Sequence, residues 1–392
     1  MAIAWKQASA TRWERHLTGM EDYLVETGRA SLELYDGRQQ YNIFSEVRVE
    51  IIVPDVESAM RQAWKQLRYE QPAIAATLGG DRKVYKSPDE AALEEWIKST
   101  FIVSDRTDTD TLTSKPIRQA TLYYLPATSE LHCFMKALAS PHPNVLFGHE
   151  HVRLLAPHDE ALAYTGSPTA KQSLDTTAMI TGYLQSLPGI GLPSEIGKAP
   201  AGACRNREHI FSKDTTADII AACMEKKVSV TSAVHAAYVC AVAVYYVRIP
   251  FTMDLPSSYR AIARALHEHY QTTLKGSPQT VALTPHYCHS ISALAKTEQF
   301  KFAPPVTDGF LSSLGVVEKH LHREYGETVK VTDFKLGLDV VFGTSGFLFY
   351  TFDEQLRFVY SFNDGYENPE KVREYLEDVY RILREELLGS TL

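Results

Sequence analysis

Apolar residues recur at two spacings along the chain, and each spacing predicts one kind of element. Apolar and polar residues alternate in segments such as 44–53, which is typical of strands. In other segments apolar residues lie three or four positions apart, which is typical of helices. Helices are predicted over 56–67, 88–101, 212–227, 232–246, 259–269 and from Asn368 onward. Further strands are predicted over 120–125, 132–138, 250–255, 347–350 and 356–362, and another within 143–155. Strands mixed with helices throughout the chain predict an α/β or α+β fold.

The middle of the chain separates two stretches with a similar mixture of elements. Residues 187–202 contain four Gly and three Pro with little periodicity, which favours a linker. We therefore expect an N-terminal lobe over 1–186 and a C-terminal lobe over 203–392. A chain of 392 residues is long enough for both lobes to have a core of their own.

The composition excludes some classes of binding partner but does not identify the function. Hydrophobic residues make up 44% and charged residues 22%, as in globular proteins. The 40 Lys and Arg against 48 Asp and Glu give a net charge of -8, which argues against binding to nucleic acid or to an anionic membrane. Five widely spaced cysteines indicate a reducing compartment. The longest apolar segment is too short to span a bilayer, so a cytoplasmic location is expected.

The segment 144–162 holds the densest group of residues suited to proton transfer. An apolar run, 145–147, precedes Gly148, and we expect it to be a strand that ends there. His149, Glu150, His151, His158 and Asp159 follow, with three imidazoles whose ordinary pKa lies near neutrality. One interpretation makes His151 a general base on a rigid strand end. The other has His149 and His151 pack or meet solvent. A metal site is not expected, because no helical H-E-x-x-H spacing occurs.

Two further groups are candidates for contacts with a substrate. His286 and Tyr287 follow a strand-like run from Val281, and they form either a binding wall or an aromatic surface loop. Thr344 and Ser345 lie between two glycines and could offer hydroxyls, although an ordinary turn explains this pattern as well.

A resemblance to a known family rests on the segment from Glu150 to Ala156. The chain resembles the superfamily of CoA-dependent acyltransferases that includes nonribosomal peptide synthetase condensation domains, and most of all its fungal branch of trichothecene 15-O-acetyltransferases. That superfamily has an H-H-x-x-x-D-G motif whose second His is the catalytic base. His151 matches this residue, whereas Glu150, Leu155 and Ala156 stand at the first His, the Asp and the Gly.

The resemblance implies two chloramphenicol-acetyltransferase-like lobes, each a mixed sheet flanked by helices, with a tunnel or cleft between them. It also implies a small-molecule substrate and acyl transfer from acyl-CoA, as a co-substrate, or from an acyl carrier protein. No permanently bound cofactor is expected. His151 would act as base, with His149, His158 and Asp159 near it and Glu150 at the substrate.

The departures from the motif leave three hypotheses open. The first is acyl transfer to an alcohol or amine, with His151 as base. The second is a cyclase or pericyclase that uses the same pocket to orient a reactive intermediate after losing the motif Asp and Gly. A protein that binds a ligand without turnover is the third.

Overall fold

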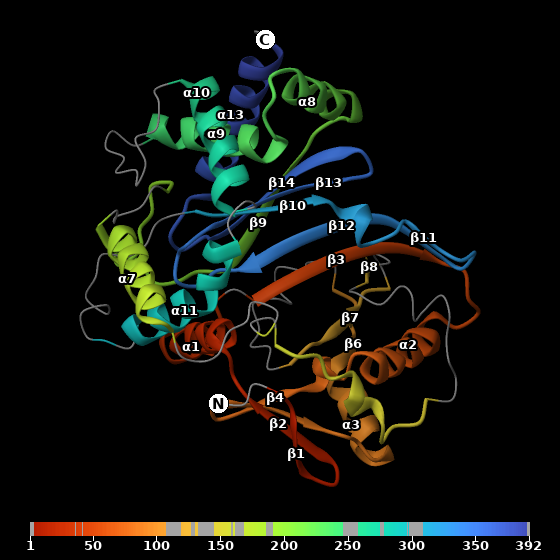
Figure 1. Ribbon diagram of the computed structural model, residues 1–392. Helices are drawn as coiled ribbons and strands as arrows, with labels where there is room; N and C mark the ends of the chain where they lie inside the picture. The colour runs from red at the N-terminus through yellow and green to blue at the C-terminus, as the bar shows by residue number, and fades with distance from the viewer. Residues whose placement is uncertain are drawn as a thin grey trace. The chain divides into compact units, whose positions relative to one another are not determined.

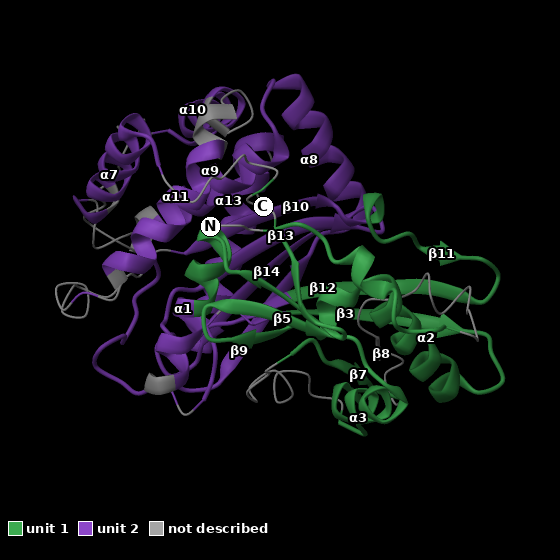
Figure 2. Ribbon diagram, turned by 60° about the horizontal axis from the view of Figure 1, so that its bottom comes forward, with its two compact units in different colours: residues 1–25, 44–167, 318–336 green, residues 26–43, 168–317, 337–392 purple. Residues whose placement is uncertain are grey.

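The computed structural model describes residues 4–35, 37–40, 42–106, 119–126, 130–131, 145–157, 160, 168–185, 191–245, 258–274, 278–295, 297 and 309–389. Its helices and strands are labelled in Figure 1. The chain divides into two compact units (Figure 2). Unit 1 comprises residues 1–25, 44–167 and 318–336, and unit 2 comprises 26–43, 168–317 and 337–392. Each unit is therefore discontinuous in sequence, which differs from the two contiguous lobes expected around a linker at 187–202.

Unit 1 contains two four-stranded sheets, ordered β1-β2-β5-β4 and β11-β12-β3-β8, and a parallel pair, β6-β7. Within the first sheet all neighbouring strands are antiparallel. The strands are β1 (Lys6–Ser9), β2 (Arg12–His16), β3 (Asn42–Ile51), β4 (Thr77–Gly79), β5 (Arg82–Lys86), β6 (Phe101–Val103), β7 (Leu122–Tyr124), β8 (Glu130–Leu131), β11 (Glu324–Tyr325) and β12 (Val329–Asp339), of which β3 and β12 cross the unit boundary.

Two helices of unit 1 begin at, or two residues after, the positions that the sequence predicts. In α2 (Val56–Glu70) the carboxylate of Asp55 accepts the Ser58 N–H at 3.0 Å, and Asp89 caps α3 (Glu90–Thr100) in the same way. Each cap satisfies a backbone donor that the first helical turn leaves free. The two helices pack through the stacked rings of Trp64 and Trp96, 5.3 Å apart. Two short 3-10 helices, η1 (Pro72–Ala75) and η2 (Glu150–Arg153), complete the unit, and a third, η4 (Val317–Lys319), lies at its boundary.

Unit 2 is built on the sheet β10-β13-β14-β9, whose helices α8, α9, α10 and α13 lie on one face (Figure 1). Phenylalanines of the central strands pack against these helices in one buried cluster, which includes Phe347, Phe349 and Phe358. The elements are α1 (Gly19–Leu34, which begins in unit 1), α7 (Ala170–Gln185), β9 (Cys204–Ile210), α8 (Lys213–Glu225), α9 (Val230–Tyr245), α10 (Tyr259–His269), a π-helical turn η3 (Tyr270–Leu274), α11 (Pro278–Ala295), β10 (Phe310–Val316), β13 (Gly346–Phe352), β14 (Gln355–Asn363) and α13 (Pro369–Leu388).

Most predicted elements are present, and the mixed α/β class is confirmed. The strand-like run expected from Val281 is wrong, since these residues lie in α11. Its Pro285 stands inside the helix, and a proline there obscures the helical pattern in the sequence. The strands expected at 132–138 and 250–255 fall outside the described residues. In the part of the chain that is described, no helix is both long and apolar enough to cross a membrane.

Candidate active site

The segment that carries His151 is a tight turn. Residues 145–146 are irregular, 147–148 form a turn and 149 a bend, and η2 follows from Glu150. The strand predicted to end at Gly148 is therefore absent from this described segment. The apolar run before Gly148 is only three residues long, and Gly148 has a φ of 124°, which favours glycine and does not continue a strand. The N–H of Leu154 bonds to the His151 carbonyl at 3.0 Å and closes the turn.

The carboxylate of Glu150, which is fully buried, stabilises the turn. It accepts hydrogen bonds from the Tyr85 hydroxyl at 2.7 Å, from the Ser87 hydroxyl and from the Gly148 N–H. Burial alone would raise the pKa of Glu150, but these hydrogen bonds outweigh it and lower the pKa. Glu150, which the sequence predicts to contact the substrate, instead turns its carboxylate into the interior of unit 1.

A buried cation lies close to this carboxylate. Arg68, on α2, is 5% exposed, and its guanidinium lies over the Trp96 ring at 4.6 Å. Burial lowers the pKa of Arg68, while the neighbouring Tyr85 and Glu150 act to raise it. A buried charge is tolerated when an opposite charge is near, so Arg68 and the ionised Glu150 stabilise each other.

The His151 ring lies partly buried on top of this turn. It stacks on Trp13 with ring centroids 4.1 Å apart and planes 12° apart, and the His149 ring is 6.5 Å away. Its Nδ1 atom is buried and has no hydrogen-bond partner among the described residues. The Glu150 carboxylate is bonded to Tyr85, Ser87 and the Gly148 N–H, so it does not orient the imidazole. His158 and Asp159 lie outside the described residues.

The positions of the motif Asp and Gly are exposed in this chain. Leu155 is 67% exposed, and only its backbone carbonyl is engaged, by the Trp5 indole N–H at 3.0 Å. Ala156 is exposed as well. Leu146 and Val152, 82% and 73% exposed, add apolar surface on the same turn. These exposed apolar side chains all lie within five residues of His151 in the chain.

The candidates from the second half of the chain belong to unit 2. His286 lies on α11 and is 6% exposed, and Tyr287 beside it is partly buried, so neither is on the surface loop considered above. Thr344 is partly buried. Ser345 is 4% exposed, and its hydroxyl donates to the buried carboxylate of Glu367. Because this hydroxyl is buried and bonded to Glu367, Ser345 stabilises the interior of unit 2 and does not offer a free hydroxyl to a substrate.

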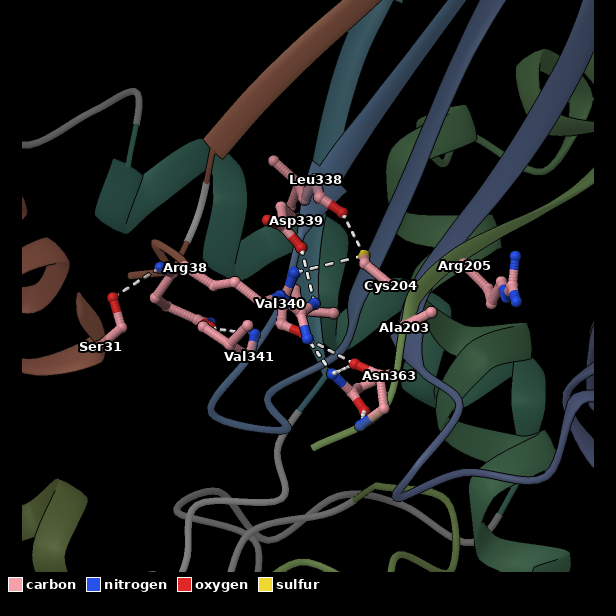
Figure 3. A network of polar contacts seen from close by, with 12 residues as sticks. Ser31, Arg38, Ala203, Cys204, Arg205, Leu338, Asp339, Val340, Val341 and Asn363 are labelled. Carbon is pink, nitrogen blue, oxygen red and sulfur yellow. Dashed lines mark hydrogen bonds and ion pairs between the residues drawn. The ribbon is translucent and has the colours of Figure 1, made fainter. Parts of the chain in front are cut away.

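A second polar cluster of unit 2 ties together segments far apart in sequence (Figure 3). Arg38 donates to the Gly202 carbonyl and forms an ion pair with the buried Asp339 at 3.4 Å. Asn363 donates to the carbonyls of Gly202 and Val340, at 3.2 and 3.1 Å. Burial raises the pKa of Asp339, and Arg38 opposes that shift. Because its polar groups bond to one another, this cluster stabilises the unit and offers no reacting group.

The chain is similar in sequence and in fold to several known proteins. No protein-family model matches the chain. The O-acetyltransferase pigM of Monascus ruber is 24% identical over 456 aligned positions, covering 98% of this chain and 87% of that protein. The acetyltransferase pigO of the same fungus is 22% identical and covers 98% of both chains. Among solved structures, the trichothecene 15-O-acetyltransferase of Fusarium sporotrichioides superposes with a TM-score of 0.79 over 97% of each chain, at 13% identity.

In its fold, the chain is similar to this acetyltransferase and to condensation domains. The condensation domain of the Monacolin K polyketide synthase is a further structural neighbour, with a TM-score of 0.59 over 97% of this chain and 98% of that one. Two-lobed, condensation-domain-like architecture is therefore confirmed for this chain. Within it, the motif segment departs from the superfamily pattern at three positions, and the structure shows what replaces them. The first His is replaced by a buried anchor, Glu150, whereas Leu155 and Ala156 are exposed.

The residues that build this site were only partly visible in the sequence. His149, Glu150 and His151 come together because they are neighbours in the chain. Trp13 and Tyr85 were missed, because they come from β2 and β5, which are distant in sequence. The β-branched Val84 and aromatic Tyr85, residue types enriched in strands, are a signal that could have identified β5.

Proposed function

We propose that the protein is an acyltransferase of fungal-type secondary metabolism, which moves an acyl group onto an alcohol or amine of a small molecule with His151 as general base. The observation that carries this proposal is the placement of His151, whose partly exposed imidazole sits on a rigid turn between a buried anchor and an indole ring. Full-length similarity to two fungal proteins named as acetyltransferases supports the same reaction class.

The proposed reaction requires one proton to move twice. His151 takes the proton from the acceptor hydroxyl or amine while its oxygen or nitrogen forms a bond to the thioester carbonyl carbon. The carbon–sulfur bond then breaks, and the imidazolium returns the proton to the leaving thiolate. Because Nδ1 is buried, Nε2 is the nitrogen that would exchange this proton.

Acyl-CoA is the simplest donor for this reaction, and an acyl carrier protein is the alternative. Both present the same thioester, so the chemistry at His151 is identical for the two. We place the reaction in the cytoplasm, where CoA is plentiful and the chain's five cysteines would remain reduced.

Turnover with acetyl-CoA and a panel of alcohols and amines tests the proposal through release of free thiol. We expect His151→Ala to lower kcat by about 10²- to 10⁴-fold, as loss of a general base does. His16→Ala is the matched control, since His16 lies in the same unit and bonds to Asp81 at 3.1 Å on the surface. A larger reduction in kcat for His149→Ala than for His151→Ala would show that His149, and not His151, is the general base.

A cyclase is the second candidate, and the exposed apolar side chains of Leu155, Leu146 and Val152 favour it. Such a surface can orient an apolar intermediate without a nucleophile or an acyl donor. Conversion of a pathway intermediate to an isomeric ring product without any thioester would establish this activity. Binding of that intermediate without conversion, with or without acetyl-CoA, would support the hypothesis of a ligand-binding protein.

A further inference from the structure

The ring of His151 has an aromatic neighbour whose position is fixed by a sheet. Trp13, on β2, is 7% exposed. It pairs with Gln7 of β1 on one side and with Tyr85 of β5 on the other. A residue in a central position between two strands cannot shift without breaking both ladders, so the indole is a rigid surface for the imidazole.

The turn that carries His151 is bound to β5, the neighbouring strand of the same sheet. Tyr85 pairs with Trp13 through the backbone, and its hydroxyl holds the Glu150 carboxylate at 2.7 Å. Both supports of the imidazole, the indole above and the turn below, therefore meet at one residue of β5. This arrangement explains how the two rings keep an interplanar angle of only 12°.

Stacking also has a chemical consequence for a base. When His151 accepts a proton it becomes a cation, and the face of an indole is the most favourable aromatic partner for a cation. In Ser-His-Asp sites a buried carboxylate stabilises the imidazolium by accepting the second N–H of the ring. Among the described residues no group accepts at Nδ1 of His151, and the Glu150 oxygens are already occupied.

We propose that Trp13 is the positioning residue of His151, holding the imidazole by stacking and stabilising its protonated form through the π face. This inference rests on the proposed function, in which His151 is the base. It predicts that the indole affects the step in which the imidazolium forms more than it affects substrate binding.

Two variants of Trp13 and one control test the inference. We expect Trp13→Leu to lower kcat about 3- to 30-fold, which is about 0.6 to 2 kcal/mol, with KM changed less than about twofold. Trp13→Phe keeps an aromatic face and should retain an intermediate kcat. Trp64→Phe is the matched control, because Trp64 also stacks within unit 1 but on Trp96, and its kcat should equal that of the wild type.

Proton NMR of isotope-labelled histidine gives a readout that does not depend on turnover. The indole ring current should shift the His151 ring protons upfield, and Trp13→Leu should abolish this shift while Trp64→Phe leaves it in place. His151→Ala assigns the signal. If Trp13→Leu leaves either the shift or kcat unchanged in a folded protein, the inference is wrong. If the shift is present but the wild type transfers no acyl group, the proposed function fails while the placement of the ring by Trp13 stands.

Should Trp13→Leu not fold, Trp13→Phe carries the test alone. Its kcat must then fall below that of Trp64→Phe, and the upfield shift must shrink. Equal values for the two variants would overturn the inference.

Discussion

Two glutamates, one in each unit, have matching side-chain partners and opposite pKa shifts. Glu150 accepts hydrogen bonds from a serine and a tyrosine hydroxyl, and so does Glu367. Both are buried, with exposed fractions of 0% and 4%. Yet hydrogen bonds lower the pKa of Glu150 despite its burial, whereas burial raises the pKa of Glu367 to about 7.

Two things differ: the surroundings of Glu367 desolvate its carboxylate more strongly, and Glu150 has further donors. Glu150 also accepts the backbone N–H of Gly148 and lies near the guanidinium of Arg68. For Glu367 the hydroxyls of Ser345 and Tyr360 are the groups that oppose the effect of burial, and they do not offset it. Two hydroxyl donors are too weak to keep the deeply buried Glu367 ionised, whereas Glu150 also accepts backbone N–H groups that help to lower its pKa. The ionised carboxylate, Glu150, lies on the same turn as the candidate base, His151.

Removing the ionised carboxylate should have the largest effect. We expect Glu150→Ala to reduce the free energy of unfolding by about 3–5 kcal/mol, because Arg68 loses its counter-charge and three donors lose their acceptor. All four tryptophans, Trp5, Trp13, Trp64 and Trp96, belong to unit 1, so tryptophan fluorescence during urea unfolding reports on this unit.

Glu150→Gln is the matched control for that measurement. The amide oxygen can still accept from Tyr85 or Ser87, so the loss should be clearly smaller than for Glu150→Ala. Equal losses for the two variants would mean that the charge of Glu150 has no part in stabilising the turn.

Glu367 should make unit 2 less stable as the pH rises. Its pKa is about 7 in the folded protein and ordinarily 4.5, so between these values the folded state binds a proton that the unfolded state has released. This stabilisation is complete below pH 4.5 and is lost as the pH rises through 7. The total is about 3 kcal/mol at about 1.4 kcal/mol per pKa unit.

Unfolding between pH 5 and pH 8, followed by near-UV circular dichroism of the aromatic core, measures the effect. Glu367→Gln removes the titration, so its stability should change less over this range than that of the wild type. Parallel curves for the two proteins would show that Glu367 is ionised on both sides of neutrality.

The contrast between these glutamates could not be predicted from the sequence. Helices with a clear cap and apolar stripe, such as α2 and α13, were predicted because their signals are local. His151 was found because its neighbours are adjacent in the chain. Trp13 and Tyr85 were not, since they reach the turn only after β2 and β5 have paired. Sequence spacing does not show which buried carboxylate receives a backbone donor.

Replacing Arg68 by methionine should make Glu150 resemble Glu367. Without the cation, the desolvation of the carboxylate is offset less, so the pKa of Glu150 should rise. The unfolding free energy at pH 7 should fall by about 2 kcal/mol. The lowered pKa of Glu150 gives the wild type stability above pH 4.5 that is lost as the pH falls through the folded pKa. Arg68→Met should weaken this acid-side dependence, measured by fluorescence-detected unfolding. A dependence as steep as that of the wild type would mean that the backbone donor alone keeps Glu150 ionised.

The smallest effects should come from deleting one hydroxyl in each unit. Tyr85→Phe and Tyr360→Phe each remove one hydrogen bond to a buried glutamate, at 2.7 and 2.9 Å, and should each cost about 1 kcal/mol. Their effects on turnover should differ, because Tyr85 joins the turn of His151 to the strand beside Trp13. Tyr85→Phe should lower kcat by a few-fold, about 2- to 5-fold, without a matching change in KM, whereas Tyr360→Phe should leave kcat unchanged. Equal reductions in kcat would show that general loss of stability, and not the support of His151, explains the effect of Tyr85.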